Sequence, residues 1–130
     1  MPALFDPYTL KDVILRNRIA VGPMCQYMAQ DGVPNDWHSV HYTSLARGGA
    51  GLVTIEATAV SPEGRISPHC PGLWNDPQAE AFAPLAARLR KAGTLAGLHL
   101  AHAGRTARAP VPCEGGHPVA TPPHPHTPPT

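Results

Sequence analysis

Three short apolar runs divide this chain at regular intervals, at residues 19–24, 51–57 and 95–101. The first run is apolar rather than alternating, which is typical of a strand that is covered on both faces of a parallel sheet. The second run is rich in β-branched residues. The segments between the runs have helical periodicity. Strands that alternate with helices predict an α/β fold with a parallel sheet and right-handed crossovers.

The first interval predicts a helix that begins at Asn35 or Asp36, because either side chain can cap a helix N-terminus. Gly48 and Gly49 mark its end. Five residues recur at helical spacing within it and predict one face of the helix: Trp37, Val40, His41, Ser44 and Leu45.

The second interval predicts a helix at residues 84–92. Proline is disfavoured inside a helix and favoured at its first position, so we expect Pro84 to begin the helix. Asp76 and Pro77 would then form a separate turn before it. Within the helix, Leu85 and Leu89 are expected to face inward.

The two ends of the chain differ from this middle part. Residues 8–10 and 13–15 are short extended pieces separated by Lys11 and Asp12, and they predict a β-hairpin. Eight of the 17 prolines lie in residues 109–130, which predicts a loop or disordered tail. We therefore expect residues 1–108 to form part of a single domain, and residues 109–130 to form a proline-rich loop or disordered tail.

Composition argues against nucleic-acid binding, membrane insertion and metal binding. The net charge of +1 provides no basic surface for nucleic acid, and no segment resembles a signal peptide or a membrane span. Three cysteines form an odd set without metal-ligand spacing, which favours a reduced cytoplasmic location. His38 and His41 lie three residues apart, but no carboxylate or cysteine set completes a metal site, so no metal is expected.

The predicted order is hairpin, β, α, β, α, β and tail. Three strand–helix units in about 100 residues match the number of residues per unit in a (β/α)8 barrel, of which this chain would be a part. A flavodoxin-like or Rossmann fold is the alternative. The first strand is followed by MCQYMAQDG, however, and not by a glycine-rich phosphate loop.

Three segments resemble the Old Yellow Enzyme family of FMN-dependent ene-reductases, in the bacterial branch with a cysteine after the first barrel strand. They are LFDPYTLKDVILRNRIAVGPMCQY, HYTSLARGGAGLVTIEATAVSPEGR and GLHLAHAGR, in collinear order from residue 3 to about residue 108. The resemblance implies a TIM barrel whose active site lies at the C-terminal ends of the strands.

The resemblance also implies a flavin wall made by Pro23, Met24 and Cys25. In such a site the thiol of Cys25 would tune the reduction potential of the flavin through a weak hydrogen bond. From the residues alone, Cys25 could equally be a small buried hydrophobe. The phenol of Tyr27 would enter the substrate pocket, although a loop tyrosine can also simply pack at the barrel end.

Ala57 would approach the flavin through its backbone at the end of the second strand. His99 stands where the family usually has glutamine, and a histidine cannot offer the same donor–acceptor fork to the flavin's pyrimidine edge. Weakened flavin binding is therefore expected. Glu56 is expected to pair with an arginine such as Arg18, whereas His102 and Arg105 are expected to be structural.

The activity that the resemblance implies is hydride transfer from NAD(P)H, through FMN, to the C=C bond of an α,β-unsaturated carbonyl compound. The family's oxyanion donors and phosphate-binding loops come from later strands, beyond these 130 residues. We therefore expect a truncated chain that is inactive alone, with a second copy as a potential partner of the full-length enzyme. The alternative is a non-catalytic partial barrel that acts as a binding or assembly module.

Overall fold

The computed structural model describes residues 1, 3–107 and 111. Strands β1 (Tyr8–Leu10) and β2 (Val13–Leu15) form an antiparallel hairpin. A second sheet contains the parallel strands β3 (Ala20–Val21), β4 (Leu52–Ala59) and β5 (Leu95–Ala101) in that spatial order. The helices α1 (Asp36–Arg47) and α2 (Asp76–Lys91) connect these strands, and 3₁₀ turns η1 (Pro62–Gly64) and η2 (Gly104–Thr106) follow β4 and β5.

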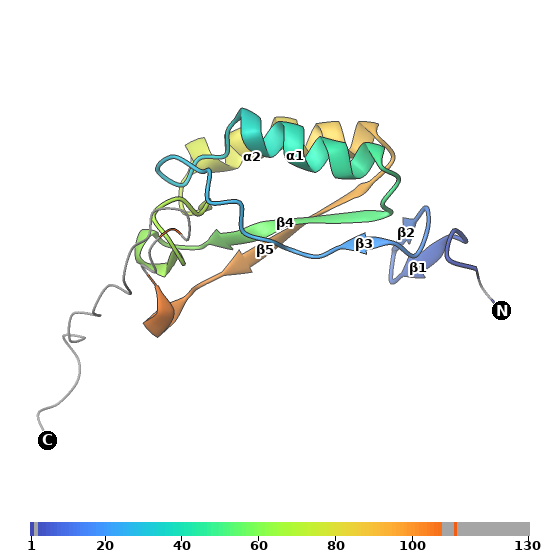
Figure 1. The fold of residues 1–130 in the computed structure, drawn as a ribbon, viewed down its shortest axis with the longest axis horizontal. Helices are drawn as coiled ribbons and strands as arrows, with labels where there is room; N and C mark the ends of the chain where they lie inside the picture. The colour runs from blue at the N-terminus through green and yellow to red at the C-terminus, as the bar shows by residue number, and fades with distance from the viewer. Residues whose placement is uncertain (2, 108–110, 112–130) are drawn as a thin grey trace, which may run out of the picture.

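The two helices cover the same face of the parallel sheet (Figure 1). The strands also follow one another in chain order across the sheet. A doubly wound fold places helices on both faces and reverses the strand order, whereas a barrel keeps the order and puts all helices outside. The arrangement is that of a partial (β/α) barrel, so the flavodoxin-like alternative does not hold.

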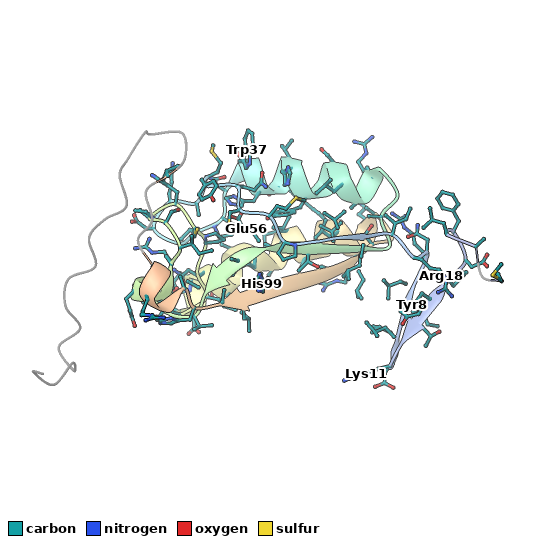
Figure 2. All side chains as sticks on the ribbon, turned by 60° about the horizontal axis from the view of Figure 1, so that its bottom comes forward. Tyr8, Lys11, Arg18, Trp37, Glu56 and His99 are labelled. Atoms are coloured by element: carbon teal, nitrogen blue, oxygen red, sulfur yellow. The ribbon has the colours of Figure 1, made fainter. Side chains whose placement is uncertain are left out.

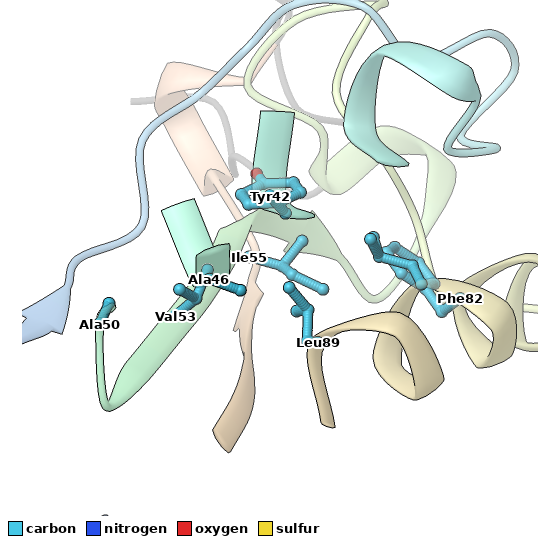
Figure 3. Packing of buried hydrophobic residues seen from close by; sticks show 8 residues of the cluster. Tyr42, Ala46, Ala50, Val53, Ile55, Phe82 and Leu89 are labelled. Carbon is cyan, nitrogen blue, oxygen red and sulfur yellow. The ribbon is translucent and has the colours of Figure 1, made fainter. Parts of the chain in front are cut away.

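The hydrophobic core lies between the sheet and the helices (Figure 3). Val53 and Ile55 of β4 enter it from the sheet, and Tyr42 and Leu89 enter it from the helices. Leu85 and Leu89 are 2% and 0% exposed, which confirms their predicted inward orientation. The face of the sheet opposite the helices is called the open face below.

Helix α1 is present as predicted, but it buries a different face. Asn35 is its N-cap, and the side chains of Asn35 and His38 form a capping box. The buried residues of the helix are His38, Tyr42 and Ala46. The five periodic residues instead line a surface hollow, because the polar side chains of His38 and Tyr42 find partners in the sheet and so occupy the inner face.

The predicted start of the second helix at Pro84 is wrong. Helix α2 begins after the N-cap Asn75, whose side chain accepts a hydrogen bond from the Gln78 N–H, and it continues through Pro84. Pro84 lies on the exposed side of the helix, where its ring meets solvent rather than the sheet. The burial of Phe82, Leu85 and Leu89 offsets the missing backbone hydrogen bond.

Strand β3 is shorter than the predicted run of residues 19–24. It pairs with β4 only at Ala20 and Val21, because Gly22 stabilises a strand poorly and Pro23 has no N–H to donate to a ladder. The residues after β3 therefore form a loop. The predicted tail at residues 109–130 lies outside the described residues except for Val111, which is buried.

Arg16 joins the hairpin to the ends of both helices. Its guanidinium donates hydrogen bonds to the carbonyl oxygens of Ala46, Ala50 and Ala92 and to the Thr94 hydroxyl, at 2.8–3.2 Å. Ala46 lies in the last turn of α1 and Ala92 is the C-cap of α2. A cation there adds hydrogen bonds to carbonyl groups at the helix ends and interacts favourably with the helix dipoles.

Candidate active site

The predicted site residues follow or end three neighbouring parallel strands. Because β3, β4 and β5 run parallel, their C-terminal ends lie at the same edge of the sheet. The loop after β3 carries four of the predicted residues, β4 carries Ala57 and β5 carries His99. The four loop residues are Pro23, Met24, Cys25 and Tyr27.

A β-bulge in β4 directs Ala57 to the open face. Ile55 is in register with Leu98, but the next pair is Ala57 with His99, so that Glu56 is the extra residue. Ile55 and Leu98 pack into the core on the helix side, and successive side chains alternate between faces. Ala57 and His99 therefore lie side by side on the open face.

Cys25 connects the loop to the end of β4. Its sulfur accepts a hydrogen bond from the backbone N–H of Ala57 and is in hydrogen-bond contact with the thiol of Cys70. Burial, then the nearby Cys70 and the charge of Glu56, raise the pKa of Cys25 to about 11. The thiol is thus a protonated hydrogen-bond donor at neutral pH and not a nucleophile.

The remaining predicted residues differ in exposure. Met24 is 55% exposed, and Pro23 and His99 are also exposed, whereas Ala57 is buried. Tyr27 is half-buried and has a left-handed backbone with φ of 57°. The site thus combines exposed apolar groups, a small residue and an imidazole.

Glu56 does not pair with Arg18 as the sequence had suggested. Arg18 lies over the ring of Tyr8, 5.0 Å from its centroid. Glu56 is fully buried between α1 and the sheet (Figure 2), where Oε1 lies 3.3 Å from His38 Nε2. The bulge turns this side chain toward the helix, whereas Arg18 lies in the segment between the hairpin and β3.

The other histidines have structural contacts. His41 packs edge-on against Tyr42, with 4.9 Å between ring centroids. His102 accepts a hydrogen bond from the Gly104 N–H and its ring covers Gly64, in agreement with its expected structural role. Among the described residues, no group of three or more His, Cys, Asp and Glu side chains is placed to hold a metal ion.

Sequence reasoning missed His38, Tyr42 and Cys70 as neighbours of the site. Cys70 carried no recognisable pattern, because it reaches the site through tertiary packing. A polar residue on the inner face of an amphipathic helix is the only signal that could have pointed to His38 and Tyr42.

A protein-family model decides the family. The model described as "NADH:flavin oxidoreductase / NADH oxidase family" matches residues 3–120. This chain belongs to that family. The match confirms the resemblance to the Old Yellow Enzyme family.

Similar proteins agree with this assignment. NADPH dehydrogenase of Listeria monocytogenes is 52% identical over 112 residues, which are 85% of this chain and 33% of that protein. The NADPH dehydrogenase of Bacillus pumilus is 50% identical over 106 residues, which are 80% of this chain and 31% of that protein. This chain spans about a third of the length of these curated relatives.

Solved structures of related enzymes share the fold. Morphinone reductase superposes with a TM-score of 0.75 at 32% identity, over 82% of this chain and 28% of that chain. The Old Yellow Enzyme homologue from Zymomonas mobilis gives 0.71 at 37% identity, over 78% of this chain and 28% of that chain. These neighbours are TIM barrels, which confirms the predicted fold class.

In the described part of this chain, no helix has the length and apolar character needed to cross a bilayer.

Proposed function

We propose that this chain supplies part of the FMN site and of the substrate pocket of an NAD(P)H-dependent ene-reductase. The observation that carries the proposal is the register pair of Ala57 and His99 on the open face, next to the Cys25 sulfur at the C-terminal ends of parallel strands. Ligands of such sheets bind at this edge, and the family is one of flavin oxidoreductases.

The residues fit one side of an isoalloxazine ring. Pro23 and Met24 offer exposed apolar surface for a flat ring, and Ala57 is small enough to let a ring approach the backbone of β4. His99 carries ring nitrogens that can donate or accept a hydrogen bond at the pyrimidine edge. When bound, the flavin supplies hydride transfer from the nicotinamide to the substrate.

Cys25 and Tyr27 act on the reacting groups in this proposal. The protonated Cys25 thiol donates a weak hydrogen bond toward the ring and thereby adjusts its reduction potential. The Tyr27 hydroxyl donates a hydrogen bond to the carbonyl oxygen of an α,β-unsaturated substrate, where negative charge develops. The name of the curated relatives, NADPH dehydrogenase, favours NADPH as the reductant.

The test uses a chimera in which this chain replaces the matched segment of the Listeria monocytogenes NADPH dehydrogenase. The purified chimera is titrated with FMN, and the flavin absorbance band and NADPH oxidation with cyclohexenone are followed. We expect a shifted band and turnover that depends on the enone. The chain of 130 residues is titrated in parallel to show how much of the site it forms alone.

Variants locate the site in the same assay. Ala57→Leu fills the space beside His99 and should abolish the FMN-induced shift while the circular dichroism spectrum is retained. Ala87→Leu makes the same change on the exposed side of α2 and should bind FMN normally. A folded chimera that binds no FMN would contradict the proposal and favour the non-catalytic module.

A further inference from the structure

Glu56 is a fully buried charged residue that the proposed chemistry does not use. It is the extra residue of the bulge in β4, and its side chain lies on the helix side of the sheet, behind the candidate active site. A buried carboxylate is costly unless several donors face it. Its surroundings therefore have to be accounted for.

Two donors hydrogen-bond to the Glu56 carboxylate, and an imidazole lies beside it. The backbone N–H of Gln26 donates to Oε2 at 2.9 Å, and the Tyr42 hydroxyl donates to Oε1 at 3.2 Å. His38 Nε2 lies 3.3 Å from Oε1. In return, the Tyr42 oxygen accepts a hydrogen bond of 2.9 Å from the Glu56 N–H, so Tyr42 is attached to both the backbone and the side chain of Glu56.

His38 belongs both to the cap of α1 and to the surroundings of Glu56. The Asn35 backbone N–H donates to His38 Nδ1 at 3.0 Å, and Asn35 Oδ1 also lies 3.0 Å from this nitrogen. The cap thus holds the imidazole with Nε2 beside the Glu56 carboxylate, 3.3 Å from Oε1.

The Gln26 amide connects this cluster to the active-site loop. Gln26 lies directly between Cys25 and Tyr27, and its side chain donates to the Met24 carbonyl at 2.9 Å and accepts from Trp37 Nε1 at 3.3 Å. Tyr27 has a left-handed backbone. A residue other than glycine keeps this conformation only where its surroundings fix it.

We propose that Glu56 is the positioning residue of the 24–27 loop: through the Gln26 amide, its buried carboxylate places Cys25 and Tyr27 at the open face. Glu56 cannot touch a substrate, because it is fully buried on the opposite side of β4. The role of this placement in flavin chemistry rests on the proposed function. The placement itself can be measured on the 130-residue chain without FMN.

The first measurement is hydrogen–deuterium exchange of the unmodified chain, resolved at Gln26. The Gln26 amide should be protected, because the Glu56 carboxylate accepts its hydrogen bond. An unprotected Gln26 amide in a folded chain would overturn the proposal without any variant.

The second measurement uses Glu56→Gln, which keeps the shape of the side chain and removes its charge. We expect exchange at Gln26 to accelerate about tenfold or more, while exchange in β5 stays unchanged. Alkylation of Cys25 by iodoacetamide, followed by peptide mass spectrometry, should begin at lower pH. Glu80→Gln makes the same change at an exposed position of α2 and should change neither result.

The outcomes separate this proposal from the proposed function. A folded Glu56→Gln chain with unchanged exchange at Gln26 and unchanged Cys25 alkylation would overturn the positioning role. If Glu56→Gln does not fold, the exchange of the unmodified chain decides. A chimera that fails to bind FMN while both Glu56 effects are present would refute only the proposed function.

Discussion

His99 of β5 lies in register with Ala57 of β4, and both side chains are directed to the open face. In the proposed FMN site, the imidazole of His99 offers one nitrogen at a time to a ring edge that presents both a donor and an acceptor. Glutamine offers both groups in one plane. His99→Gln should therefore increase the FMN affinity of the chimera about tenfold, as for one additional hydrogen bond, which a flavin fluorescence titration can measure.

The control for His99→Gln is His41→Gln, because His41 lies on α1, on the other side of the sheet, where it lines the surface hollow. This second variant should leave the FMN affinity unchanged. An equal gain in both variants would show that the effect is not specific to the open face. Unchanged affinity in His99→Gln would mean that His99 does not reach the flavin.

Much of the fold could be predicted because it depends on local pattern. The largely apolar runs at residues 51–57 and 95–101 predicted two strands of the parallel sheet, which are present as Leu52–Ala59 and Leu95–Ala101, and Asn35 marked the start of α1. The location of the candidate active site followed from this topology, because the C-terminal ends of parallel strands lie at the same edge of the sheet. The order of the elements was therefore available from the sequence.

The environment of the site could not be predicted in the same way. Alternation along a strand gives no sign of an extra residue, so the bulge that turns Glu56 inward and Ala57 outward was invisible. Charge alone favoured an arginine partner for Glu56. Its real partners, His38 and Tyr42, are chosen by the packing of α1 on β4, which no local pattern encodes.

Pro84 illustrates how tertiary packing overrides helix propensity. It lies inside α2 on the exposed side, so Pro84→Ala should restore one backbone hydrogen bond without creating a clash. We expect the free energy of unfolding to rise by about 1–3 kcal/mol, measured by urea denaturation. Pro77→Ala is the matched control, because a proline in the first turn costs no hydrogen bond. Equal effects of the two variants would contradict this explanation.

The raised pKa of Cys25 predicts a loss of stability at alkaline pH. Burial is its largest cause, and the pKa rises from 9.0 to about 11. Below about pH 9 the thiol is protonated in both the folded and the unfolded chain. Between about pH 9 and about pH 11 only the unfolded thiol ionises, so the unfolded state binds fewer protons and the free energy of unfolding falls as pH rises.

Urea denaturation at a series of alkaline pH values measures this fall. Cys25→Ser removes the titrating group at nearly constant size and should flatten part of the decline between about pH 9 and about pH 11. The part that remains includes Tyr42, because burial also raises the pKa of its phenol. If the two chains lose stability in parallel across this range, the Cys25 thiol is not the group responsible.

Arg16 should be a large source of stability that lies far from the candidate active site. It bonds the last turn of α1, the C-cap of α2 and the Thr94 hydroxyl at once, and this requires the planar fork of a guanidinium. Arg16→Lys keeps the charge but cannot reach all three positions. It should lower the free energy of unfolding by about 1–3 kcal/mol, because several charge-assisted hydrogen bonds between the hairpin side and the helix ends are lost.

The matched control is Arg47→Lys, which makes the same change at an exposed position in the last turn of α1. Arg47→Lys should shift stability by less than about 0.5 kcal/mol. If the two variants lose the same small amount, the interaction of a positive charge with the helix ends accounts for the role of Arg16. A loss confined to Arg16→Lys would show that the fork geometry is required, with the hairpin held against the helices by directed hydrogen bonds.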